Sequence, residues 1–164
     1  DERGMFAKTI SVEIVLQFGL TSIKEYFFSR SNKNVWRGMH LQVGEHESNR
    51  LIYCANGEVK DFVIDLRTES DSYLEVMEFS LALGDAMDGL FIPAGVAHGF
   101  LAMKDNSEIH YISDKSYSKD HDTGINPMSI PEVNRLLTHR GNISISERDL
   151  SLPSLQEFIE GYLK

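Results

Sequence analysis

The chain has 164 residues, of which 41% are hydrophobic and 25% are charged, proportions typical of a soluble globular protein with a single domain spanning residues 1–164. Its formal net charge of −9 argues against a nucleic-acid partner, because such proteins neutralise phosphates with clustered lysine and arginine. No apolar run approaches the ~20 residues that cross a bilayer, so we expect no membrane partner. Cys54 is the single cysteine, which excludes an intrachain disulfide and favours the reducing cytoplasm.

Short strand-like runs fill the middle of the chain. Before them, residues 11–18 fit either a strand or two helical turns. The five runs that are short, partly alternating and rich in β-branched and aromatic residues are 51–54, 62–66, 74–79, 90–92 and 109–112. Turn-forming residues separate them, and Asn56-Gly57 predicts a β-hairpin. Residues 154–163 follow Pro153 with one apolar face and predict an amphipathic helix.

Strands at this spacing, without alternating long helices, favour an all-β antiparallel barrel or sandwich. Two histidine motifs stand out within it. The first is Arg37-Gly38-Met39-His40, and the second runs from Pro93 to Phe100 and contains His98. The second reads Pro-x-Gly-x-x-His, which is typical of the second half of a cupin barrel. The first has one histidine where a metal-binding cupin has His-x-His, which favours proton chemistry over metal chemistry.

A set of further motifs occurs in order along the chain. They are Asp1-Glu2-Arg3-Gly4, Ser29-Arg30-Ser31, Arg37 to Gln42, Gly57-Glu58-Val59, Asp65-Leu66-Arg67, Ile92 to Phe100, Gly124-Ile125 and Ser146 to Asp149. This ordered set resembles the dTDP-4-dehydrorhamnose 3,5-epimerase family over almost the whole chain. The resemblance implies a cupin-type double-stranded β-helix, an isomerase without a cofactor, a nucleotide-diphosphate sugar as substrate and a homodimer. It also implies that this chain lacks N-terminal strands that the family carries before the first motif.

The reaction implied by the resemblance inverts stereocentres next to a 4-keto group. A base removes an acidic proton, the carbonyl oxygen takes up enolate charge, and an acid returns a proton on the opposite face of the ring. His40 is the predicted base, because an unperturbed imidazole, with a pKa near ~6.5, accepts a proton at neutral pH. Asp149 is the predicted partner that orients it. Tyr111 is the predicted acid, since its place in the strand-like run directs it towards the barrel interior.

The resemblance implies that four further residues lie near the sugar. Arg50 stands where the family usually has a lysine close to the substrate carbonyl, and its planar, always charged group is no simple equivalent. His98 is expected to contact the substrate without a metal. Tyr117 is expected to line the pocket, and Asp122 stands where the family usually has a glutamate that contacts the substrate.

The resemblance implies that three arginines hold the diphosphate, and guanidinium groups suit this role because they bind phosphate oxygens in a bidentate manner. These are Arg37, Arg148 and Arg3, and the resemblance implies that Arg3 acts across the dimer interface. Arg37 precedes His40 by three residues. In a regular strand the two would point to opposite faces, so both can line one cavity only if the strand is twisted or bulged.

No metal site is predicted. The residues near His40 that offer ligand atoms are Gln42, Glu45, His46 and Glu47. Glutamine is a poor replacement for the second histidine of a His-x-His pair, and residues 46–47 are interpreted as a polar loop. The histidines that match no motif, and are interpreted as surface residues, are His110, His121 and His139.

Several positions that contact sugar or nucleotide in the family differ in this chain. Residues 25–27 replace a Gln-x-Asn pattern, Lys8 replaces a glutamate, and residues 126–129 replace a Trp-Asp-Pro segment. A retained catalytic set beside an altered recognition set predicts epimerisation of a nucleotide-linked 4-keto-6-deoxyhexose at C3 and C5, or at one carbon only. Three alternatives stay open: a 3,4-keto-isomerase, a metal-dependent cupin, and a sugar-binding cupin without turnover.

Overall fold

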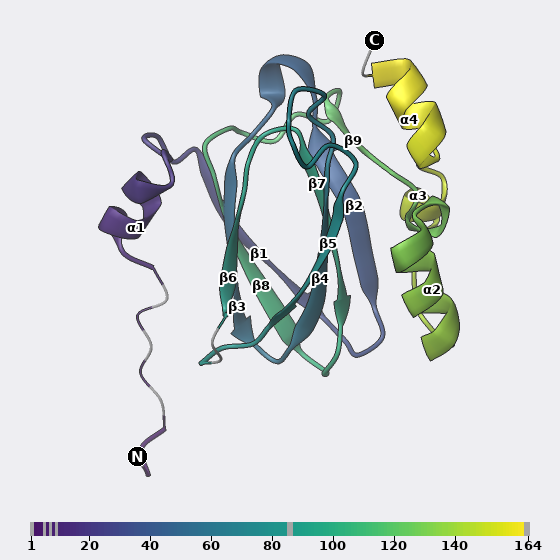
Figure 1. Ribbon diagram of the computed structural model, residues 1–164. Helices are drawn as coiled ribbons and strands as arrows, with labels where there is room; N and C mark the ends of the chain where they lie inside the picture. The colour runs from purple at the N-terminus through teal and green to yellow at the C-terminus, as the bar shows by residue number, and fades with distance from the viewer. Residues whose placement is uncertain (1, 5, 7, 9, 85–86, 163–164) are drawn as a thin grey trace.

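The computed structural model describes residues 2–4, 6, 8, 10–84 and 87–162. Its centre consists of two antiparallel β-sheets, with helices on both outer sides (Figure 1). Three residues of the predicted features lie outside the described residues. They are Asp1 of the first motif, Asp85 among the turn-forming residues between the runs 74–79 and 90–92, and Leu163 of the C-terminal helix.

One sheet has four strands in the order β1-β8-β3-β6, and the other has five in the order β5-β4-β7-β2-β9. The four-stranded sheet contains β1 (Glu25–Ser31), β8 (Ser107–Ser113), β3 (Arg50–Asn56) and β6 (Gly89–Ile92). The five-stranded sheet contains β5 (Val76–Leu81), β4 (Val59–Asp65), β7 (Val96–Ala102), β2 (Trp36–Gln42) and β9 (Asp122–Gly124). The helical segments are α1 (Val12–Gln17), η1 (Gly44–His46), η2 (Pro127–Ser129), α2 (Pro131–Arg140), α3 (Glu147–Leu150) and α4 (Leu155–Tyr162).

The predicted all-β class is confirmed, because each of the five predicted runs overlaps a strand (β3, β4, β5, β6 and β8). The ambiguous segment 11–18 is helical: Ser11 caps α1 by accepting a hydrogen bond from the main-chain N of Ile14 at 3.3 Å. The predicted C-terminal helix is α4. Helix α2 was not predicted, although Pro131 at its first turn and the buried Val133 and Leu137 at i, i+4 spacing are helix signals.

The hairpin predicted at Asn56-Gly57 is wrong. The turn is present, with Gly57 at a φ of 76°, but it connects β3 of one sheet to β4 of the other. A Cβ on residue 57 would lie 2.7 Å from the Cα of Ser107, so the chain needs glycine where it passes this close to β8. The Ser107 hydroxyl donates to the main-chain oxygen of Glu58 at 2.9 Å. The tight turn is therefore a corner between sheets.

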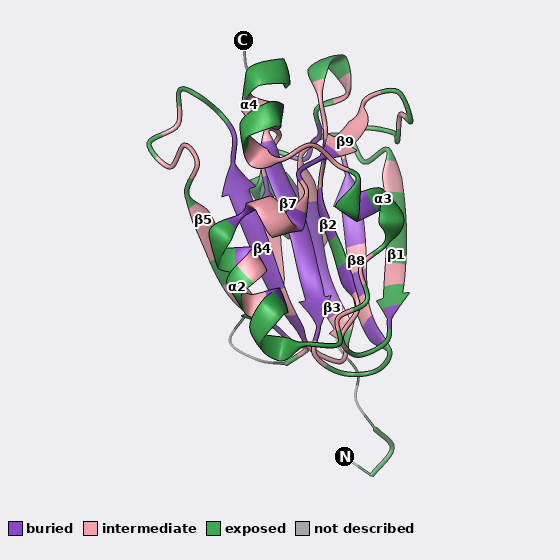
Figure 2. Ribbon diagram, turned by 90° about the vertical axis from the view of Figure 1, so that its right-hand side faces the viewer, coloured by how far each residue is buried: buried purple, intermediate pink, exposed green. Residues whose placement is uncertain are grey.

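Hydrophobic side chains pack in three layers. Between the sheets lie residues such as Ile52 of β3 and Phe100 of β7. On the outer face of the five-stranded sheet, Phe62 packs with Leu137 of α2 and Phe158 of α4. Figure 2 shows this buried sheet behind α2 and α4. A smaller cluster lies under α1. Helices pack on the outer side of each sheet, and the space between the sheets is open to a site.

A β-bulge in β2 resolves the orientation of Arg37 and His40. Arg37 is opposite Phe100 and His40 is opposite His98, so β2 has one more residue than β7 between these two pairs. Both side chains consequently line the same cavity. Gly38 in the bulge has a φ of 114°, and a Cβ there would lie 2.4 Å from the Cα of Gly99. The bulge that the spacing required is present, and it depends on glycine.

Candidate active site

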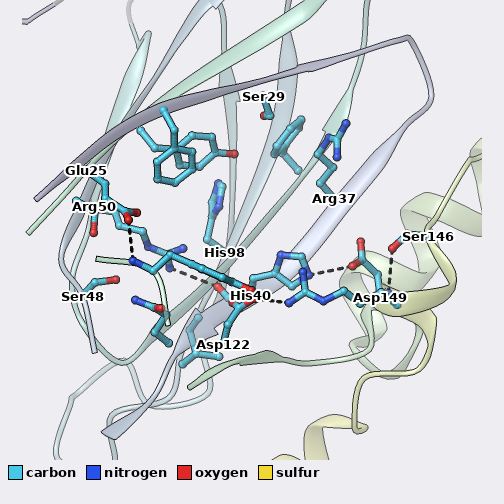
Figure 3. Close-up of a pocket in the computed structure, with 18 of the residues that line it drawn as sticks. Glu25, Ser29, Arg37, His40, Ser48, Arg50, His98, Asp122, Ser146 and Asp149 are labelled. Carbon is cyan, nitrogen blue, oxygen red and sulfur yellow. Dashed lines mark hydrogen bonds and ion pairs between the residues drawn. The ribbon is translucent and has the colours of Figure 1, made fainter. Parts of the chain in front are cut away.

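A cavity of about 500 Å³ opens between the two sheets (Figure 3). Its walls come from β1, β2, β3, β7, β8, β9 and the segment from residue 144 to α3. Nine of the ten predicted site residues line it, and these are Arg37, His40, Arg50, His98, Tyr111, Tyr117, Asp122, Arg148 and Asp149. Arg3 is exposed and is not among the lining residues.

His40 and Asp149 form a hydrogen-bonded pair at one wall. Nε2 of His40 lies 2.9 Å from Oδ1 of Asp149, which comes from α3. The second carboxylate oxygen accepts from the main-chain N of Gly38 at 3.2 Å, and the Ser146 hydroxyl that caps α3 accepts from the Asp149 amide. Burial acts to raise the pKa of Asp149, but its hydrogen bonds from His40 and Gly38 lower that pKa overall. Asp149 is therefore ionised and accepts the Nε2 proton of His40.

His98 also pairs with a carboxylate. Its Nε2 lies 2.7 Å from Oδ2 of Asp61 in β4, and the side chains of both residues are at most 5% exposed. Burial raises the pKa of Asp61, and the neighbouring His98 and Arg50 oppose that rise. Asp61 was not among the predicted site residues. The sequence pattern does indicate its position, because Asp61 alternates with Val59 and Val63 and so faces inward from a strand.

Tyr111 lies in the wall formed by the four-stranded sheet. Its ring stacks on Phe27 with centroids 4.7 Å apart, and it meets His98 edge-on with centroids 6.1 Å apart. Only 8% of the residue is exposed. Burial raises the pKa of Tyr111 to about 12, partly opposed by nearby Arg50 and Arg37. The phenol therefore keeps its proton at neutral pH.

Arg50 connects three parts of the cavity wall. Its Nη2 donates to the main-chain oxygens of His40 and Val96, each at 3.3 Å. Burial lowers the pKa of the guanidinium, while Tyr111 and Asp122 oppose this. Within the described residues, its Nε is buried without a hydrogen-bond partner, as is Oδ1 of Asp61. Buried polar atoms without a protein partner are rare, and a bound ligand or water can supply the missing hydrogen bond.

Positively and negatively charged side chains line the mouth of the cavity. Arg37 donates through Nε to the Ser31 hydroxyl at 2.9 Å, and Arg148 forms an ion pair with Asp122. Tyr117 is 57% exposed, and its main-chain N donates to Glu25 at 2.9 Å. Burial and the neighbouring Asp122 raise the pKa of the Tyr117 phenol.

Lys115 and Glu25 also line the mouth and were not predicted as site residues. Glu25 belongs to the segment 25–27 that departs from the family pattern. No motif marks Lys115.

The arrangement combines the groups needed to move protons next to a carbonyl. An imidazole oriented by an ionised carboxylate can accept a proton, and a buried phenol can donate one. Cationic side chains at the mouth suit an anionic substrate despite the negative net charge of the chain.

The sequence and the fold of this chain are similar to those of known proteins. The sequence model of the dTDP-4-dehydrorhamnose 3,5-epimerase family matches residues 1–157. The dTDP-4-dehydrorhamnose 3,5-epimerase of Escherichia coli K12 is 35% identical over 128 residues, covering 76% of this chain and 68% of the relative. The protein of the same name from Methanothermobacter thermautotrophicus is 34% identical over 160 residues, covering 96% and 85%.

Among solved structures, a dTDP-6-deoxy-D-glucose-3,5-epimerase from Legionella pneumophila Philadelphia 1 is similar to this chain. It was solved in complex with dTDP-4-keto-L-rhamnose. The TM-score is 0.82 at 26% sequence identity, with 95% of this chain and 82% of that chain covered.

Proposed function

This chain belongs to the dTDP-4-dehydrorhamnose 3,5-epimerase family, and we propose that it epimerises a dTDP-linked 4-keto-6-deoxy sugar at C3, C5 or both. The observation that carries this proposal is the sharing of one cavity by the His40–Asp149 pair and the buried Tyr111 phenol. These groups supply a base, its orienting partner and an acid.

In the proposed mechanism, His40 removes the proton from the carbon next to the ketone. Its Nε2 proton is held by Asp149, so Nδ1 has the free lone pair that accepts the substrate proton. The ionised Asp149 stabilises the imidazolium that forms. The electrons of the broken C–H bond move to the carbonyl oxygen as an enolate.

Tyr111 then protonates the carbon from the opposite face, which inverts the stereocentre. Its raised pKa of about 12 keeps it protonated before this step. The resulting phenolate is close to Arg50, whose positive charge favours it, and Arg50 and His98 also stabilise the enolate oxygen. Proton exchange with solvent resets His40 and Tyr111 for the next turnover.

Arg37 and Arg148 are proposed to bind the diphosphate at the cavity mouth, with Tyr117 and Asp122 beside them. Arg148 already pairs with Asp122, so substrate binding involves rearrangement of an existing ion pair. We propose that Arg3 completes the site from the partner in a homodimer. In support, the edge strand β1 has Tyr26 and Phe28 more than half exposed, and edge strands with exposed aromatic residues are pairing surfaces.

The dimer is tested separately by sedimentation velocity of the full chain. A Phe28→Lys variant should sediment as a monomer. If the wild-type protein is already monomeric, Arg3 does not act in a partner's site.

We further propose that residues 1–164 act as one domain in the cytoplasm. Within the part of the chain that the structure describes, no helix is long and apolar enough to cross a membrane.

The function is tested by incubating the protein with dTDP-4-keto-6-deoxyglucose in deuterated water and following the sugar by NMR. Deuterium at both C3 and C5 with inverted configuration supports double epimerisation, and deuterium at one carbon supports the narrower activity. A ketone found at C3 would identify a keto-isomerase. Folded protein that gives no exchange would favour a binding protein without turnover and contradict the proposal.

A further inference from the structure

A second cluster of ligand-bearing side chains lies outside the cavity, where η1 approaches the loop before β9. Glu45, His46 and His121 each offer a ligand atom, and these atoms lie within 4.8 Å of one another. The ring centroids of His46 and His121 are 4.4 Å apart. We propose that these three side chains bind a divalent transition-metal ion of the Zn²⁺ class.

The donor set indicates the type of ion. Two imidazoles and one carboxylate suit Zn²⁺ and its first-row neighbours, whereas Ca²⁺ and Mg²⁺ prefer sites made of oxygen atoms. In a tetrahedral zinc site, bonds of about 2.0–2.2 Å place ligand atoms about 3.4 Å apart. Glu45 is exposed, so its side chain can rotate and bring its carboxylate oxygen closer to the imidazole nitrogens, from within 4.8 Å to about 3.4 Å. Water would complete the coordination, as in other zinc sites with three protein ligands.

His121 has a hydrogen bond of the kind that supports metal-binding histidines. Its Nδ1 lies 2.8 Å from the hydroxyl of Ser118. When Nδ1 carries the proton and donates it to this oxygen, Nε2 has the lone pair that a metal needs. A hydrogen bond to the second ring nitrogen is typical of metal-binding histidines, because it selects the tautomer and fixes the ring.

Gln42 holds together the two segments that carry the ligands. Its amide Nε2 donates to the main-chain oxygen of His46 at 3.1 Å and to that of Ser116 at 3.3 Å. Its Oε1 accepts from the main-chain N of Ser118 at 2.6 Å. The main-chain N of Val43 also donates to the oxygen of His121 at 3.0 Å. These hydrogen bonds therefore fix the main chain at both histidines before any ion binds.

This site differs in position from the cavity between the sheets, but the two are connected. Gln42 lines the cavity, and so does Lys115, whose Nζ donates to the main-chain oxygen of Glu45 at 3.2 Å. A bound ion would tie η1 to the loop before β9 and stiffen this wall of the cavity. It would take no part in proton transfer, so removal of the ion should leave turnover in place.

The proposal is tested with the full chain, without a histidine tag, after dialysis against a chelator. Isothermal titration with ZnCl₂ should show one Zn²⁺ per chain. His46→Ala and His121→Ala should each abolish this binding. His139→Ala is the matched control, because it removes an exposed histidine on α2 and should bind Zn²⁺ as the wild type does. Ser118→Ala should weaken binding by about 10–100-fold, the usual effect of losing such a supporting hydrogen bond.

Two results would overturn the proposal. One is a wild-type protein that binds no Zn²⁺, and the other is binding that persists in both His46→Ala and His121→Ala, which would assign the ion to other histidines. Circular dichroism melting curves verify that each variant is folded. If a histidine variant does not fold, the Zn²⁺ titration is repeated with Glu45→Gln, since this exposed position tolerates substitution. Weaker binding supports the site, and unchanged affinity counts against it.

Discussion

His40 and His98 are directly opposite each other on β2 and β7, yet each imidazole hydrogen-bonds a different carboxylate. Asp149 reaches His40 from α3, and hydrogen bonds lower the pKa of this carboxyl. Asp61 reaches His98 from β4, and burial raises its pKa. Two like pairs in different surroundings can have different roles. This supports His40 as the base and His98 as a group that binds the substrate.

Replacing Asp149 with asparagine should lower kcat by about 10²–10⁴-fold, because an amide can stabilise neither the imidazolium nor the required tautomer of His40. Steady-state rates with the dTDP-4-keto sugar measure this. The melting temperature should stay close to that of the wild type, since asparagine has the same shape and can still accept from Gly38. A variant with nearly full turnover would remove Asp149 from the mechanism.

A Tyr111→Phe variant should separate the two proton transfers. Inversion should fall by about 10²–10⁴-fold because the acid is lost. Deuterium should still enter the sugar with retained configuration, because His40 can remove a proton and return a deuteron on the same face. Tyr53→Phe is the control, since this hydroxyl bonds Tyr26 on the outer face of the sheet. If Tyr111→Phe inverts the sugar at the wild-type rate, the acid is another group.

Arg50 is expected to contribute mainly through its positive charge in the buried wall. Arg50→Lys should keep measurable turnover, whereas Arg50→Met should lose about 10²–10³-fold in kcat, the usual loss when one group that stabilises an oxyanion is removed. Comparison of kcat and KM for the two variants measures this. Equal activity of the lysine and methionine variants would mean that the charge plays no part in the reaction.

Gly38→Ala should destabilise the protein by about 2–5 kcal/mol, because the Cβ meets the Cα of Gly99 at a positive φ. Urea unfolding followed by circular dichroism measures the free energy of unfolding. Gly161→Ala is the matched control, since it lies in α4 with open space around it, and it should be neutral or stabilising by about 0.5–1 kcal/mol. Equal stability of Gly38→Ala and wild type would contradict the tight bulge.

Asp65 should make the protein sensitive to acid. Its hydrogen bonds from Arg67, and from Ser70 and Ser72, hold its pKa well below the usual value. Because the folded pKa is lowered, the stabilisation is complete above the unfolded pKa of ~3.9 and disappears as the pH falls towards the folded value. Asp65→Asn should therefore be less stable than wild type at pH 7, and the difference should shrink below about pH 4. A constant difference would contradict this.

The pattern of the chain was enough to predict the class of fold and most of the cavity. Alternation along a strand is a local property, so it places Tyr111 inside and marks strands such as β4 and β8 without knowledge of their neighbours. The spacing of Arg37 and His40 also required a bulge before its position was known. The same local rule applies to Asp61, which alternates with Val59 and Val63 on the inward face of β4.

Pairings between distant segments were decided by the tertiary structure. Asn56-Gly57 has the composition of a hairpin turn, but its flanking strands find better partners in opposite sheets, where their apolar faces meet in one core. For the same reason, no sequence pattern brings Asp61 to His98 or His121 to His46. Sequence sets which face of each strand is apolar, whereas the packing of two sheets against each other sets which polar side chains meet across them.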